Sequence, residues 1–166
     1  MSFINDTLKN DTSEAILDYI KALKRLKELG VIKNQKDFTS QLGEWLISEI
    51  FDGELAESGK QRDWDIKIDK KKYQVKAHAK STSTNRKNTD FKYSINANID
   101  FFVIVVFDET YKLEKIYKVP FKEAYKLVTW ESKDKVIRWK DLEANYVIDL
   151  IKIIENKSNL RIFINE

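Results

Sequence analysis

The sequence predicts one mixed α/β domain in which helices flank a β-sheet core. The first observation is the order of its patterns: two helical segments come first, strand-like segments follow, and a helical segment interrupts the later strands. The second is size and composition, because 166 residues with 42% hydrophobic and 12% aromatic content suffice for a single core. The third is the scarcity of helix and strand breakers, since 4 Gly and 1 Pro leave no low-complexity linker.

The N-terminal part predicts one amphipathic helix. Residues 1–10 carry no clear pattern, and we expect them to be loosely ordered. Asp11 is an acidic N-cap with Glu14 three residues after it, and Gly30 is a natural stop. We assign residues 11–36 to this helix and expect it to pack against the core without a chemical role. Its apolar residues share one face: Ile16, Ile20, Leu23, Leu26 and Leu29.

A second helix is predicted over residues 37–51. It is apolar over much of its circumference, so we expect other elements to cover it on more than one side. Glu44 and Glu49 lie within it, and each is either held in a partly buried site or solvated. This helix opens a motif-bearing core, residues 37–128, of a single domain that spans 1–166.

A charged β-hairpin is predicted over residues 64–80, with the sequence WDIKIDKKKYQVKAHAK. Apolar and polar residues alternate on both sides of a turn at 69–72, as in strands with one buried face. The second strand places three polar side chains on the face opposite its apolar residues: Gln74, Lys76 and His78. If the apolar faces of the two strands coincide, Asp65 meets Gln74 and Lys76 on the other side.

The remaining segments complete the sheet and its flanks. The run at 99–107 is the most apolar of the chain and predicts a central strand buried on both faces. The patterns that follow predict a strand at 113–119, a helix at 121–128 opened by Pro120, a short strand at 136–139, a helix at 141–155 that strand propensity also allows, and a last strand at 160–164.

Positive charge is concentrated around the hairpin. Residues 60–92 hold eleven Lys or Arg against four Asp, a net charge of +7, whereas the rest of the chain carries −4. The loop at 81–90 is polar throughout, which suits contact with a phosphate backbone. A lysine-rich solvated surface would produce the same excess.

Several classes of protein are excluded or disfavoured. The absence of Cys excludes disulfides, thiolate zinc sites and cysteine nucleophiles, and the single His excludes a His-rich zinc site. The chain has no glycine-rich phosphate loop, so no nucleotide cofactor is expected. It has no N-terminal apolar leader and no run near the ~18 apolar residues that span a membrane. We therefore expect a cytoplasmic protein with no membrane partner.

Four short segments together resemble the PD-(D/E)XK nuclease superfamily. They are Gly43-Glu44-Trp45-Leu46 in a helix, Asp65 at the start of a strand, Tyr73-Gln74-Val75-Lys76 in the next strand, and Asp100-Phe101 opening a hydrophobic strand. The resemblance is to restriction-endonuclease-like domains with a GE helix, a D strand and a YQ(V/I)K strand, and it covers residues 40–125. It implies a restriction-endonuclease-like mixed sheet.

The resemblance also implies an active site. Asp65 would bind a metal ion, together with the Gln74 amide oxygen and the Val75 carbonyl. Lys76 would position the attacking water and neutralise the phosphate. Glu44 would complete the site from the helix, with Glu49 as the alternative acid. The cofactor implied is Mg²⁺, with Mn²⁺ as a substitute, and the reaction is phosphodiester hydrolysis.

The expected substrate is double-stranded DNA, cut by a type II restriction-type homodimer. Besides the catalytic residues, four side chains are candidates for DNA binding: His78, Lys80, Arg86 and Lys87. The chain departs from the superfamily at Gln74, where Glu or Asp is usual, and one neutral oxygen binds Mg²⁺ less well than a carboxylate. A catalytically decayed DNA-binding module, or a structural or interaction protein, therefore remains an alternative.

Overall fold

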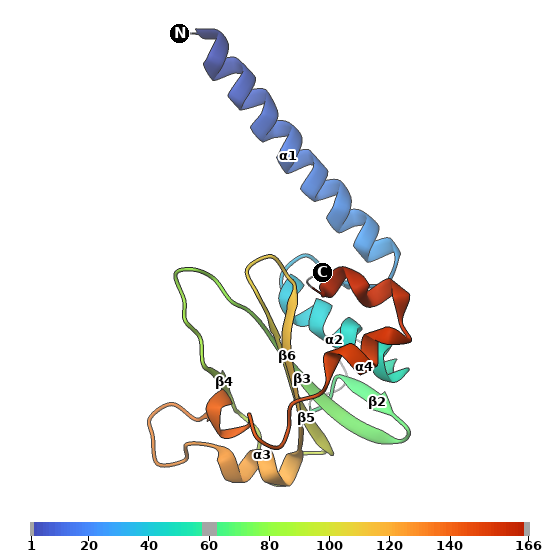
Figure 1. Ribbon diagram of the computed structural model, residues 1–166, viewed down its shortest axis with the longest axis vertical. Coiled ribbons are helices and arrows are strands. Elements are labelled where there is room, and N and C mark those ends of the chain that lie inside the picture. Colours follow the sequence, from blue (N-terminus) through green and yellow to red (C-terminus); the bar gives the residue numbers. More distant parts are fainter. Residues whose placement is uncertain (1, 58–62, 165–166) are drawn as a thin grey trace.

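A mixed sheet forms the centre of the computed structural model, which describes residues 2–57 and 63–164 (Figure 1). Its five strands lie in the order β1-β2-β3-β5-β6. The central pair, β3 and β5, is parallel, and the other neighbours are antiparallel. The strands are β1 (Glu54–Leu55), β2 (Ile66–Ile68), β3 (Lys71–Ala79), β5 (Phe101–Phe107) and β6 (Leu113–Pro120). The prediction of a mixed sheet flanked by helices is confirmed.

The sheet separates two apolar cores because its central strand is buried on both sides, as predicted for residues 99–107. In β5, Val103 and Val105 belong to the core on the side of helix α2 (Phe38–Phe51), and Phe102 and Ile104 belong to the other. All four side chains are fully buried. The second core is closed by helix α3 (Phe121–Leu127), which starts directly after Pro120 as the sequence predicted.

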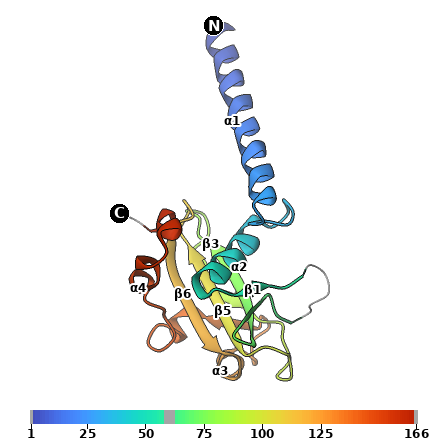
Figure 2. The ribbon, with the colours of Figure 1, turned by 90° about the vertical axis from the view of Figure 1, so that its right-hand side faces the viewer.

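Helix α2 lies across one face of the sheet and packs against β3 (Figure 2). Its predicted start is confirmed, since the Asp37 carboxylate caps it by accepting a hydrogen bond from the Ser40 N–H. Gly43 faces β3 in α2, and a Cβ at this position would overlap the Cβ of Ala77. The missing side chain thus lets the helix that carries Glu44 approach the strand that carries Lys76.

A small second sheet replaces part of the predicted loop at 81–90. Strand β4 (Asn88–Asp90) pairs antiparallel with β7 (Val136–Arg138), the short strand predicted at 136–139. The polar sequence gave no sign of β4, but its central residue Thr89 is buried and hydrogen-bonded to His78 and Trp139. Only residues 81–87 are exposed throughout, so the loop is shorter than predicted.

Two C-terminal predictions are wrong. Residues 141–155 do not form one helix: a 3₁₀ turn, η1 (Trp139–Asp141), comes first and helix α4 is limited to Leu150–Glu155. Between them Val147 pairs with Tyr117, and the Ile148 N–H bonds to the Ile116 carbonyl, so this β-branched stretch lies along the outer edge of β6. The predicted strand at 160–164 is instead the 3₁₀ helix η2 (Ser158–Phe163). Its Leu160 and Phe163 are buried in the core on the α2 side of the sheet.

The N-terminal helix also differs from the prediction. Helix α1 runs from Ser2 to Glu28, so residues 2–10 are helical rather than loosely ordered; Met1 lies outside the described residues. This stretch contains no Gly or Pro to stop a helix. The helix projects away from the sheet and does not pack along the core as expected (Figures 1 and 2). No helix in the described ranges has the length and apolar character that crossing a membrane requires.

Candidate active site

Asp65 is fixed against the strand that follows it. Its Oδ2 accepts hydrogen bonds from the Val75 N–H at 2.8 Å and from Gln74 Nε2 at 2.5 Å. The backbone N–H of Asp65 also donates to the Tyr73 carbonyl at 2.8 Å, which continues the hairpin ladder past β2. The hairpin therefore brings Asp65 to Gln74, as the alternation predicted. Burial raises the pKa of the Asp65 carboxyl, and the Val75 N–H and the Lys76 ammonium oppose this effect.

Gln74 is buried and presents its donor atom to Asp65. The amide Nε2, not Oε1, faces the carboxylate, and it also lies 3.4 Å from the Val75 carbonyl. The oxygen predicted to bind a metal is therefore not the atom that Gln74 directs at Asp65. The Asp65 carboxylate has its charge compensated by two N–H donors of the protein itself.

Glu44 is the helix acid that faces this group. The pKa of Glu44 is raised to about 7, mainly by burial and next by the nearby Asp65 carboxylate, while Lys33 and Lys76 oppose the shift. Glu49 lies farther along α2, where its backbone carbonyl accepts a hydrogen bond from Lys157. Of the two predicted acids, Glu44 is thus the one that interacts with Asp65 and Lys76.

Lys76 lies beside an aromatic ring that the sequence did not single out. Its Nζ is 5.5 Å from the ring centre of Tyr93, close enough for a cation–π interaction. Burial raises the pKa of the Tyr93 hydroxyl, and the Lys76 ammonium opposes this shift. Tyr93 comes from the segment after β4, and the sequence there shows only alternating apolar and polar residues, with Phe91 and Ile95 on either side. The ring holds the Lys76 side chain on the side of the sheet where Gln74 lies.

A pocket of about 190 Å³ opens next to Lys76. Its wall includes Tyr93 and the half-buried His78, and three more charged residues surround it: Arg86, Asp90 and Lys92. Arg86 is tied to the β4 edge, since its Nε donates to the Asn88 carbonyl at 2.9 Å and its Nη2 lies 3.3 Å from Asp90 Oδ2. The pocket is therefore lined by more basic than acidic groups.

His78 is a structural residue of this wall rather than a cation for DNA. Its Nε2 is 2.9 Å from Thr89 Oγ1, and the Trp139 indole N–H donates to the same hydroxyl at 2.9 Å. The rings of His78 and Trp139 lie 5.6 Å apart. The pKa of the imidazole is lowered to about 4, mainly by burial and next by Arg86, so the ring is neutral at pH 7. A neutral ring adds no charge for a phosphate backbone, and DNA binding by His78 stays a prediction.

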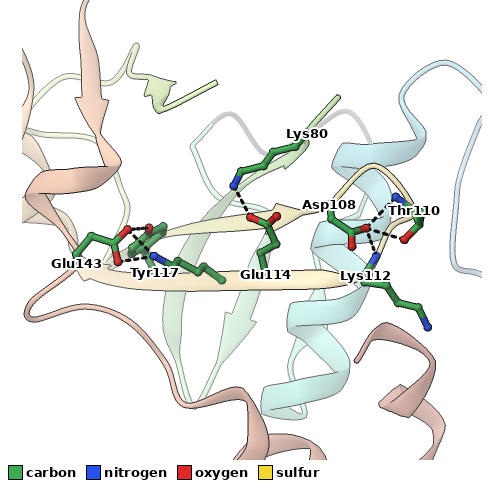
Figure 3. A network of polar contacts seen from close by, with 8 residues as sticks. Lys80, Asp108, Thr110, Lys112, Glu114, Tyr117 and Glu143 are labelled. Atoms are coloured by element: carbon green, nitrogen blue, oxygen red, sulfur yellow. Dashed lines mark hydrogen bonds and ion pairs between the residues drawn. The ribbon is translucent and has the colours of Figure 1, made fainter. Parts of the chain in front are cut away.

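The other predicted DNA contacts lie beyond the pocket. Lys80 follows β3 and forms an ion pair with Glu114 of β6 (Figure 3). Lys87 is exposed, and its backbone carbonyl accepts a hydrogen bond from the Trp139 N–H. Both line a broader groove of about 580 Å³ to which Arg138 and Lys140 also contribute. Arg138 and Lys140 were not predicted, because β7 and β4 are far apart in the chain and meet only in the fold.

Next to Lys80 the polar network continues along β6. Glu143 accepts hydrogen bonds from Lys115 Nζ and the Tyr117 hydroxyl, at 2.6 and 2.8 Å (Figure 3). Burial raises the pKa of Tyr117, and the bond to Glu143 raises it further. Asp108 closes the β5–β6 turn by accepting from the Thr110 and Lys112 N–H groups. These acids have hydrogen-bond partners within the fold.

The donor set is compatible with a hard divalent cation. Two half-buried carboxylates, Asp65 and Glu44, repel each other, and the Val75 carbonyl offers a neutral oxygen. The Gln74 amide would offer a second one only if it turned its Oε1 toward Asp65. Within residues 2–57 and 63–164 no group of three or more His, Asp or Glu side chains is arranged to hold a metal ion. A cation at this place would thus depend on two acids and neutral ligands.

Neither the models of known protein families nor the curated proteins include a match.

Proposed function

We propose that the chain is a metal-dependent endodeoxyribonuclease that hydrolyses DNA phosphodiester bonds. One observation carries the proposal: Asp65 is hydrogen-bonded to the strand that bears Gln74 and Lys76. A second acid, Glu44, faces this group, and its pKa is raised to about 7, mainly by burial. Acids and a lysine that converge next to a basic pocket suit chemistry on a phosphate. The cofactor is Mg²⁺, for which Mn²⁺ can substitute.

The chain's own residues have separate roles in this proposal. A bound Mg²⁺ would supply Lewis acidity toward the phosphate and lower the pKa of a water molecule. Asp65, Glu44, Gln74 and the Val75 carbonyl would hold the ion. Lys76, kept in place by the Tyr93 ring, neutralises charge on the phosphate and orients the attacking water. Arg86, Lys80 and Lys87 line the pocket and groove along which the DNA backbone would lie.

The substrate we propose is double-stranded DNA, cut by a homodimer of the type II restriction class in the cytoplasm. Each protomer carries one candidate site, so two copies are needed to cut both strands at once. The basic residues around the groove provide affinity for the backbone but carry no base sequence information.

The test is a cleavage assay that compares the wild-type chain with variants of the site. Unmethylated DNAs of varied sequence are incubated with Mg²⁺ or Mn²⁺ and the wild-type chain, Asp65→Asn, Lys76→Ala or Lys67→Ala. Lys67 is an exposed lysine of β2 and serves as the matched control. We expect cleavage by the wild type and Lys67→Ala, and a loss of at least about 100-fold in the two site variants, as general acid–base or electrostatic groups typically contribute. Equal cleavage by all four proteins, or by none on any DNA, would contradict the proposal.

One observation favours a second function, a DNA-binding module whose catalytic site has decayed. Gln74 donates its amide N–H to Asp65 and so compensates the carboxylate without a cation. Gln74→Glu separates the two functions, because it restores an acid at this position. If only Gln74→Glu cuts DNA, and the wild type binds DNA with a steep salt dependence, the decayed module is correct.

A further inference from the structure

Helix α1 leaves an apolar face uncovered. It extends over 27 residues and projects from the rest of the chain (Figures 1 and 2). Ile16, Tyr19 and Ile20 are exposed by 56%, 60% and 54%, although each is large and apolar. A helix of about this length spans roughly 40 Å, and an isolated amphipathic helix normally has a partner for its apolar side. The apolar face of α1 is therefore left without a packing partner in the part of the chain that the structure describes.

The apolar face repeats every seven residues, as in a two-helix coil. One row holds Thr12, Tyr19 and Leu26, and a second holds Ala15, Ala22 and Leu29. In an antiparallel pair centred between residues 20 and 21, Tyr19 lies against Ala22 of a second copy, and Leu26 lies against Ala15. Each bulky side chain then meets a small one, which is the arrangement that fills a helix interface without voids.

Charge favours the same arrangement. Residues 10–19 contain three acids and no base, whereas residues 20–28 contain four bases and one acid. The flank beside the apolar face carries Asp11, Asp18 and Arg25 at intervals of seven residues. A two-fold axis that makes the helices antiparallel brings this flank of one copy against the same flank of the other, so Asp18 faces Arg25 twice. In a parallel pair the flank would instead meet the one that carries Ile16 and Leu23.

We infer that α1 is a dimerisation helix that pairs antiparallel with α1 of a second copy of this chain. The inference rests on the exposed apolar face and its charge order and is independent of the nuclease proposal. In this dimer the two copies associate through α1, and their sheet domains lie at opposite ends of the helix pair. Antiparallel alignment also lets the two helix dipoles oppose each other.

Sedimentation of the full chain, with exchange of single-charge variants, tests the inference. The wild type is expected at twice the 19.6 kDa chain mass. Asp18→Arg alone places Arg against Arg at both contacts, and Arg25→Asp alone places Asp against Asp, so each variant is expected to dissociate at least about 10-fold more readily. Mixed in equal amounts, the two variants pair every Arg with an Asp, and a heterodimer of wild-type affinity is expected.

A monomeric wild type at micromolar concentration overturns the inference, as does a dimer that Tyr19→Glu leaves intact. A dimer that Tyr19→Glu disrupts but the charge exchange does not affect would show a parallel pair or another geometry, and would overturn the antiparallel assignment. Far-ultraviolet circular dichroism and the fluorescence of the 4 Trp residues, all of which lie outside α1, verify that each variant remains folded. DNA cleavage is not a readout here. A monomeric wild type would also contradict the homodimer of the proposed function, whereas the proposed hydrolysis is tested separately by the cleavage assay.

Discussion

At the scale of single residues, the acids of the candidate site are held where their charge is unfavourable. Glu44 is partly removed from water and lies near a second carboxylate, Asp65, which is itself half-buried. Surrounding lysines offset only part of this repulsion. A site arranged in this way is poised to bind a cation or a proton, and its protonation contributes to the pH dependence of stability.

Glu44→Gln is expected to stabilise the metal-free protein at high pH. The folded protein raises the pKa of Glu44 from 4.5 to about 7, so the folded state binds a proton more tightly, and stability is lost as the pH rises from 4.5 through 7. With screening by solvent, the gain for the variant at pH 8 is about 1–2 kcal/mol.

Urea unfolding in a chelating buffer at pH 4 and pH 8 measures this change. Glu49→Gln is the matched control on the same helix, and it should show no comparable pH-dependent gain. If Glu44→Gln raised the free energy of unfolding over that of the wild type by the same amount at both pH values, the raised pKa of Glu44 would be refuted.

His78 is expected to titrate far below the usual range for His. Burial lowers the pKa of the His78 imidazole in the folded protein to about 4, whereas the same group in the unfolded chain has a pKa near 6.5. Stability therefore falls as the pH drops from 6.5 toward 4. The chain has 1 His, so the imidazole proton signals in a nuclear magnetic resonance titration need no assignment. A midpoint near 6.5 would show that the ring is not buried against Thr89 and Trp139.

At the scale of elements, close approach of α2 to β3 determines where the site residues lie. Gly43→Ala is expected to destabilise the fold by about 1–3 kcal/mol, because the new Cβ overlaps Ala77 and must push the helix away from the strand. Chemical denaturation measures the loss. Ser40→Ala, on the same helix, controls for helix propensity, and Ala77→Gly combined with Gly43→Ala should recover part of the loss.

The turn between β2 and β3 stores strain that a glycine would release. Asp69 and Lys70 both have positive φ, 47° and 67°, in the left-handed region that suits a two-residue hairpin turn. Lys70→Gly should raise the free energy of unfolding by about 0.5–1 kcal/mol, since Lys pays a steric cost there. Lys71→Gly, one residue later within β3, should lower it. The reverse order of stabilities would contradict the turn geometry.

The sequence could predict the elements whose patterns are long or whose partners are close in the chain. The hairpin, α2, β5 and β6 were all predictable, because alternation and helical spacing report a buried face directly. Strand β4 was not, since Thr89 is buried by residues that the sequence does not connect with it. The η2 segment is predicted as a strand because a short apolar run has no clear period, so its pattern does not distinguish a strand from a 3₁₀ helix.

At the scale of the whole molecule, the candidate site combines segments that differ in how far they could be foreseen. The contact between Asp65 and Gln74 follows from the hairpin alone. The choice of Glu44 over Glu49 requires knowing which way α2 crosses the sheet, and the support of Lys76 by Tyr93 requires the path of the chain between β4 and β5. The direction of the Gln74 amide depends on local hydrogen bonds that sequence patterns do not encode.

The parallel pairing of β3 with β5 has a consequence for how the site assembles during folding. The two strands meet with Tyr73 opposite Phe101, so the chain between them must close a long loop before any of these contacts form. The β2–β3 hairpin requires only its own turn. The acid and the lysine are thus brought together by a fast local step, and the buried strand that holds them rigid is added by a slow nonlocal one. We therefore expect two phases in folding kinetics. The site residues come together in the fast phase, and the pairing of β3 with β5 fixes their positions in the slow phase.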